Sequence, residues 1–150
     1  MATTSPQRIV TWRTFLEAHA AITQLLDEEL RAERGLPLTW YDVLVNLDEA
    51  PAGRVRMQHL ANAVLFSRSG LTRLVDRMEK DGLVRREPCP DDARGTFAVL
   101  TAAGRRMLRR AAPVHLRGIE EHFLRHLSDA EVRALGSALQ KVVRAGERSR

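Results

Sequence analysis

Apolar residues recur at spacings of three and four along residues 8–32, which is the period of a helix with one buried face. Gly35 and Pro37 follow this stripe, and both residue types end helices. Thr39 precedes a second apolar run and has Asp42 three residues later, a pair that resembles a capping box. The pattern predicts a long amphipathic helix and then a shorter helix capped by Thr39.

The middle of the chain has shorter segments. Residues 54–56 are expected to be extended, and apolar positions in residues 57–64 predict a short third helix. Ser67 is a good N-cap for a fourth helix, and Gly82 is suited to its C-terminal end. Because only a tight connection through Phe66 separates these two helices, the segment indicates a helix-turn-helix.

Next along the chain the pattern changes to that of strands. Residues 83–87 and 96–100 are rich in strand formers, and residues 88–95 form a turn-promoting run between them. A strand, a charged loop and a strand after a helix-turn-helix are typical of a β-wing. Arg94 is expected at the tip of this loop.

Helical spacing returns over residues 101–127, with an interruption expected at Pro113. Ser128 and Glu131 form a full capping box in front of a last apolar helix. The order of elements predicts a fold that is mainly α with a small β-wing, a winged helix-turn-helix with N- and C-terminal dimerisation helices.

We expect residues 1–150 to form one domain, with the winged helix-turn-helix at 54–110. The flanking helices, at 8–50 and 111–146, carry more apolar surface than a small winged module can cover. A second copy of the chain would cover it, which predicts a homodimer. These helices also offer room for an effector pocket.

Charge is distributed unevenly. Residues 54–110 hold 13 Lys and Arg against 6 Asp and Glu, a net charge of +7, whereas the remaining residues hold 11 against 13, a net charge of −2. The basic block predicts a surface for a polyanion, although a solvated charged face would look the same. The sequence has no long apolar run, no apolar N-terminal signal and one cysteine, which favours a cytoplasmic protein without membrane contact.

The fourth predicted helix carries basic and hydroxyl side chains opposite its apolar side. Arginine can fork onto guanine and hydroxyls can reach phosphates, so this stripe predicts contact with double-stranded DNA. Arg94 fits a narrow minor groove, and Asp92 or its neighbour Asp91 is expected to pair with Arg77 or Arg86. The DNA-contact candidates are Ser67, Arg68, Ser69, Thr72, Arg73, Arg77, Arg86, Asp92 and Arg94.

Residues 67–86 (SRSGLTRLVDRMEKDGLVRR) closely resemble the MarR family of bacterial transcription regulators. Asp92-Ala93-Arg94-Gly95 and the later Leu-Thr-Ala-Ala-Gly at 100–104 resemble that family's wing signature. The resemblance implies a dimer with interlocked terminal helices on a pseudo-palindromic operator. It also implies residues 68–77 in the major groove, Arg94 in the minor groove and Asp92 bracing the wing. Family members are commonly repressors released by small, often aromatic or lipophilic, molecules.

Three side chains are candidates for holding such an effector: Trp12, His19 and Trp40. Aromatic rings and one imidazole could bind a planar organic acid or a phenol, and plain core packing is the alternative. Cys89 could sense oxidants, but no second cysteine exists to resolve a sulfenate, so an incidental thiol is the simpler interpretation.

His115, His122 and His126 fall on one predicted helical face, and the last two have a spacing that can chelate zinc. A metal-responsive regulator is therefore one alternative, and histidines at a dimer interface are the other. No catalytic or cofactor-binding motif is present, which predicts neither an enzyme nor a cofactor. An architectural DNA binder without effector and a protein-interaction adaptor remain as further alternatives.

Overall fold

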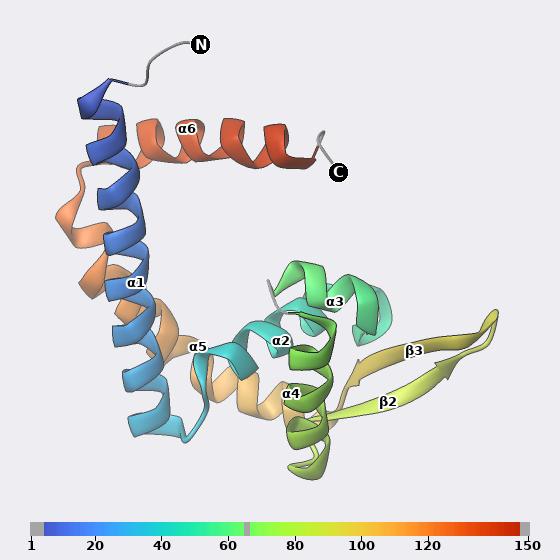
Figure 1. Ribbon diagram of the computed structural model, residues 1–150. Helices are drawn as coiled ribbons and strands as arrows, with labels where there is room; N and C mark the ends of the chain where they lie inside the picture. The colour runs from blue at the N-terminus through green and yellow to red at the C-terminus, as the bar shows by residue number, and fades with distance from the viewer. Residues whose placement is uncertain (1–4, 65–66, 148–150) are drawn as a thin grey trace. The chain divides into compact units, whose positions relative to one another are not determined.

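The structure is a computed structural model that describes residues 5–64 and 67–147 (Figure 1). Its helices and strands follow the predicted order. The elements are α1 (Pro6–Arg34), α2 (Leu38–Glu49), η1 (Pro51–Gly53), β1 (Arg54–Arg56), α3 (Met57–Ala63), α4 (Arg68–Lys80), β2 (Val84–Cys89), β3 (Asp92–Leu100), α5 (Ala102–His122), η2 (Leu124–His126) and α6 (Asp129–Glu147). The predicted fold class, mainly α with a small β-wing, is confirmed.

Two compact units divide the chain. The sheet unit comprises residues 26–115, and the helical unit comprises residues 5–25 and 116–147 among those described. All the buried apolar side chains found in the described residues lie between Leu26 and Val114. The sheet unit therefore has a hydrophobic core of its own, whereas the helical unit leaves its apolar side chains at least partly exposed.

The sheet unit is built around a three-stranded antiparallel sheet in the order β1-β3-β2. β3 is the central strand, pairing with β1 from Arg54↔Val99 to Arg56↔Phe97 and with β2 from Val84↔Leu100 onward. Figure 1 shows β2 and β3 as a long hairpin that projects away from α3 and α4. The base of the hairpin is buried, because Val84 of β2 and its partner Leu100 of β3 both belong to the core.

The second helix begins differently from the prediction. Its N-cap is Pro37, in extended conformation, and Thr39 makes no capping bond because it lies inside α2. The Leu38 N–H is instead satisfied by the carboxylate of Asp27 on α1, at 2.8 Å. The cap comes from a residue distant in sequence, and this is why the local pattern around Thr39 was misleading.

The wing also differs from the prediction. β2 and β3 extend through most of the expected loop, so that only Pro90 and Asp91 form the turn. Arg94 consequently lies on β3, beside the turn rather than at its tip. Pro88 is tolerated inside β2 because β2 is an edge strand, where a missing backbone donor breaks no interior ladder.

The expected interruption at Pro113 is wrong, because α5 runs through this residue from Ala102 to His122. Ala111 and Val114, on either side of Pro113, are buried, so packing holds the helix together despite the lost hydrogen bond. The helix ends instead at His122, because the backbone of the next residue, Phe123, leaves the helical region at φ −132° and ψ −66°. The connection through Phe66 lies outside the described residues.

Candidate nucleic-acid interface

α4 is held at both ends by local hydrogen bonds. At its start the Ser67 hydroxyl accepts a bond from the Gly70 N–H at 3.1 Å, which confirms the predicted N-cap. At its end Gly82 adopts φ +73°, a left-handed conformation that glycine adopts without strain. The predicted apolar side is also confirmed, because Leu71, Leu74, Val75 and Met78 are all buried.

The opposite side of α4 is exposed to solvent. It carries the predicted stripe of Arg68, Ser69, Thr72, Arg73 and Arg77. The Thr72 hydroxyl donates back to the carbonyl of Arg68 at 2.9 Å, so that it is partly engaged within the helix. Within the described residues, the guanidinium groups of Arg68, Arg73 and Arg77 form no ion pair with a carboxylate. Their charge is available to a partner.

Asp92 organises the turn of the wing. One carboxylate oxygen accepts the backbone N–H of Arg94 at 3.0 Å, and the other lies 3.3 Å from Nη1 of Arg56. The expected pairing of Asp92 with Arg77 or Arg86 is therefore wrong, because β1 brings Arg56 to this carboxylate instead. The Arg94 side chain is left exposed next to the turn.

Arg56 is a component of the site that the sequence did not reveal. Its guanidinium carbon lies 5.8 Å from the centre of the Phe97 ring, and that of Arg54 lies 4.9 Å from the same ring. Both distances suit cation–π attraction. The Arg-Val-Arg sequence of β1 indicated that both arginines lie on the same face of the strand. It could not show which groups they contact, because this depends on the pairing of β1 with β3.

A groove of about 440 Å³ runs between the N-terminal half of α4 and the hairpin. Arginine side chains from four elements line it, together with one carboxylate, that of Asp92. The charged lining residues are Arg56, Arg68, Arg86, Asp92 and Arg94. The structure therefore brings together helix and wing candidates that lie far apart in the sequence.

Arg86 differs from the other arginines of the groove. Its guanidinium lies 2.8 Å from the carboxylates of both Asp76 and Glu79 on α4. It also donates to the carbonyl of Thr72 at 3.1 Å. Arg86 is thus bound within the protein, whereas the sequence placed it among the residues that contact DNA.

The effector candidates are distributed over both units. In the helical unit Trp12 is 56% exposed and stacks on Phe15, whereas His19 helps to line an apolar pocket of about 680 Å³. Trp40 is half-buried and belongs to the sheet unit. Trp12 is not among the residues that line this pocket, so the predicted trio is not a single site within either unit.

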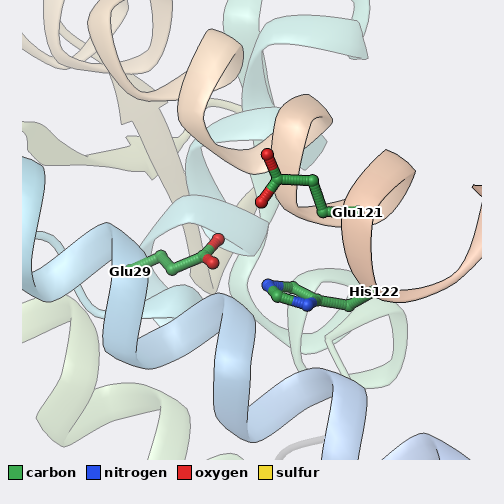
Figure 2. Close-up of side chains that lie close together, drawn as sticks. All are labelled: Glu29, Glu121 and His122. Atoms are coloured by element: carbon green, nitrogen blue, oxygen red, sulfur yellow. The ribbon is translucent and has the colours of Figure 1, made fainter.

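The three histidines do not share one helical face. His122 is the last residue of α5, next to Glu121, as Figure 2 shows, and His126 lies in η2. Their spacing of four residues therefore does not place both on one helix. Nε2 of His126 lies 3.1 Å from the Glu121 carbonyl oxygen.

His115 packs its ring against Tyr41, with 4.3 Å between the ring centres. Burial lowers the pKa of His115 below its usual value, because the charged imidazolium is disfavoured away from water. Burial also raises the pKa of the Tyr41 hydroxyl. Both groups are therefore neutral at pH 7.

Comparisons with known proteins agree on one family. A model of the MarR family matches residues 34–95. Among curated proteins, the transcriptional regulator HosA of Escherichia coli O111:H- is 36% identical over 86 residues, which are 57% of this chain. The alignment spans 63% of the length of HosA.

In the described residues, no helix has the length and apolarity needed to cross a membrane.

Two solved structures from Streptomyces coelicolor match more of the chain. AbsC, a MarR family transcriptional regulator, is 36% identical with a TM-score of 0.88, and the match covers 100% of this chain and 100% of AbsC. Sco3205, another MarR family regulator solved in complex with DNA, is 36% identical with a TM-score of 0.87, over 97% of this chain and 91% of its own. These relatives are regulators and not enzymes, in agreement with the absence of catalytic motifs from the sequence. With 36% identity over at least 91% of each of these chains, the chain belongs to the MarR family.

Proposed function

We propose that the protein is a transcriptional regulator that binds a specific DNA operator through α4 and the β2–β3 hairpin. The observation that carries this proposal is the groove between them, in which Arg86 is bound to carboxylates of α4 but Arg68 and Arg94 pair with no carboxylate among the described residues. Such a charge balance suits phosphate groups, which dominate the affinity of proteins for DNA. The DNA complex of Sco3205 supports the same partner.

The two sides of the groove would read DNA differently. A major groove admits an α-helix, and the exposed arginines of α4 have the reach to fork onto guanine. Arg94, on the hairpin, would enter the adjacent minor groove, where a narrow groove concentrates negative potential. Asp92 contributes indirectly, because its bonds to Arg56 and to the Arg94 backbone hold the start of β3 in place.

The first test compares Arg73→Ala with Arg109→Ala. A duplex would be selected from a random library with the wild-type protein, and affinities would be measured by fluorescence anisotropy on it and on a random duplex. Both arginines are exposed and neither lines the groove, but Arg73 lies on the exposed stripe of α4 whereas Arg109 lies on α5. Arg73→Ala should cost about 1–3 kcal/mol on the selected duplex and much less on random DNA. Equal losses on the two duplexes would show that Arg73 touches only phosphate.

The second test concerns the wing. Arg94→Ala should weaken binding to the selected duplex without lowering the melting temperature, because its side chain is exposed and forms no ion pair among the described residues. Calorimetric melting and anisotropy on the same preparation would separate the two effects. Unchanged affinity would contradict the minor-groove assignment.

We also propose that the protein binds DNA as a homodimer. α6 has 19 residues, and none of them is buried. Its apolar stripe includes Val142 and Val143, which are 69% and 60% exposed. A helix stripe of this kind is unstable in water without a partner, and a second copy of the chain is always present. Two winged modules would then meet half-sites about one helical turn apart, roughly 34 Å.

The dimer can be tested with two substitutions that add the same charge to the same helix. Leu139 lines the apolar pocket, whereas Gln140 is an exposed polar residue next to it. Leu139→Asp should yield monomers by light scattering and lose affinity for the selected duplex, and Gln140→Asp should do neither. A dimeric Leu139→Asp variant with full affinity would refute this interface.

The regulator would act as a repressor that a small organic molecule releases. The placement of His19 and Phe15 in an apolar pocket supports a planar aromatic acid as the ligand class. Benzoate is a suitable first probe, added to the complex of protein and selected duplex. Release by zinc instead would favour the metal-responsive alternative, and binding without sequence preference would favour an architectural protein.

A further inference from the structure

Arg86 connects the wing to the recognition helix through several bonds at once. Its Nη1 atom lies 2.8 Å from Oδ1 of Asp76 and 2.8 Å from Oε2 of Glu79, and its Nη2 atom donates to the Thr72 carbonyl at 3.1 Å. Glu79 also returns to the strand, because its Oε1 accepts the Arg86 backbone N–H at 2.9 Å. The contacts extend over two turns of α4.

This arrangement has a consequence for the orientation of α4. The buried apolar side of α4 anchors the helix, but apolar packing is not directional and tolerates small rotations. Hydrogen bonds to charged groups require defined distances and angles. A side-chain tip lies about 5–6 Å from the helix axis, so a rotation of roughly 20° moves it by about 2 Å. Such a shift is enough to lose a contact between Arg73 and a base.

The local charge argues against a direct DNA contact by Arg86. One guanidinium faces two carboxylates, so the cluster of Arg86, Asp76 and Glu79 has a net negative charge. Side-chain exposure is 24% for Arg86 and 50% for Asp76. Arg73 and Arg77, by contrast, pair with no carboxylate in the part of the chain that the structure describes.

We propose that Arg86 is a positioning residue that sets the orientation of the recognition helix, and that it reduces the negative charge of Asp76 next to the DNA rather than binding DNA itself. The proposal rests on the proposed function, namely operator binding through α4. It replaces the role that the sequence suggested for Arg86, since the residue would act through Glu79 and Asp76. It also explains how a carboxylate on the exposed stripe of α4 is compatible with a phosphate backbone.

The test is a double-mutant cycle of Arg86→Gln and Glu79→Gln, with Arg85→Gln as the control. Arg85 is adjacent on the same strand, is 56% exposed and pairs with Glu87 instead of α4. Each variant would be titrated with the selected and the random duplex at several salt concentrations, at a temperature where melting curves show that it is folded. Arg86→Gln should lower the preference for the selected duplex by about tenfold or more, as for one lost base contact.

Two further readouts separate positioning from other roles. If Arg86 acts through Glu79, adding Arg86→Gln to the Glu79→Gln variant should change the preference much less than in wild type. Additive effects, with a salt slope reduced by about one, would identify a phosphate ligand and overturn the proposal. A lower melting temperature with an unchanged preference would show a merely structural role and overturn it as well.

Binding by the wild-type protein and by Arg73→Ala separates failure of the proposed function from failure of the positioning role of Arg86. If it prefers no selected duplex, the proposed function fails and this inference fails with it. If it prefers the selected duplex and loses that preference in Arg73→Ala, operator binding through α4 stands. Retention of the preference in Arg86→Gln would then overturn only the positioning role.

Discussion

Replacing Gly104 with Ala should destabilise the sheet unit, although alanine is the better helix former. Gly104 lies in the first turn of α5, where a Cβ atom would meet the Leu83 carbonyl oxygen at 2.1 Å and Cδ1 of Leu100 at 2.8 Å. The Leu83 oxygen cannot easily move away, because it accepts bonds from the backbone N–H and the hydroxyl of Thr101, at 3.2 and 2.9 Å. The glycine is required by this close approach of α5 to the backbone of Leu83, which precedes β2.

The expected magnitude follows from two opposing contributions. Alanine gains about 1 kcal/mol over glycine inside a helix. Overpacking costs about 1–3 kcal/mol, and contact with a fixed backbone oxygen places this site at the upper end. The net loss at Gly104 is then about 2 kcal/mol. For a chain of 150 residues this corresponds to a melting temperature lower by about 4–8 °C.

Gly136 provides a matched control within α6. A Cβ atom there meets nothing within 4 Å, so Gly136→Ala should gain up to about 1 kcal/mol of stability. Both variants can be compared with wild type by circular dichroism on heating and in urea. If Gly104→Ala raises the melting temperature as Gly136→Ala does, the close contact with Leu83 is not a constraint and the argument is refuted.

Two other substitutions test the sheet unit. Ala52 has φ +57°, a left-handed conformation that costs a residue with a side chain about 1–2 kcal/mol. Ala52→Gly should therefore raise the melting temperature. An unchanged melting temperature would show that Ala52 is not strained. Because the pKa of His115 is lowered on folding, the unfolded chain takes up a proton first as pH falls below about 6.5, and stability should decline from there through the folded pKa. His115→Phe should remove this part of the loss of stability. The measurement is the free energy of unfolding in urea at pH 7.5 and 5.5, for wild type and variant. The same loss of stability in both proteins would contradict the prediction.

The sequence predicted the elements whose stability is local. The four buried positions of α4 recur at helical spacing, and the Ser67 cap needs only its own neighbours. The exposed stripe of α4 followed directly from the same spacing. For this reason most of the recognition helix was predicted without knowledge of the rest of the fold.

The errors concern bonds between elements that are distant in sequence. Asp27 replaces Thr39 as the cap of α2, and Arg56 replaces Arg77 or Arg86 as the partner of Asp92. Each of these pairings depends on how a strand or helix packs against another. Residue spacing along the chain carries no information about that packing, and the commitment of Arg86 to α4 was hidden for the same reason.

The single cysteine of the chain lies in the wing and can report on its motions. Cys89 is 5% exposed, and a Cβ atom on Gly95 would come within 2.9 Å of its sulfur, so little space surrounds the thiol. A labelling reagent can reach the sulfur only when the end of the hairpin opens transiently. The labelling rate therefore measures the free energy of that opening, without any engineered probe. A duplex bound across the hairpin should slow labelling in proportion to its occupancy.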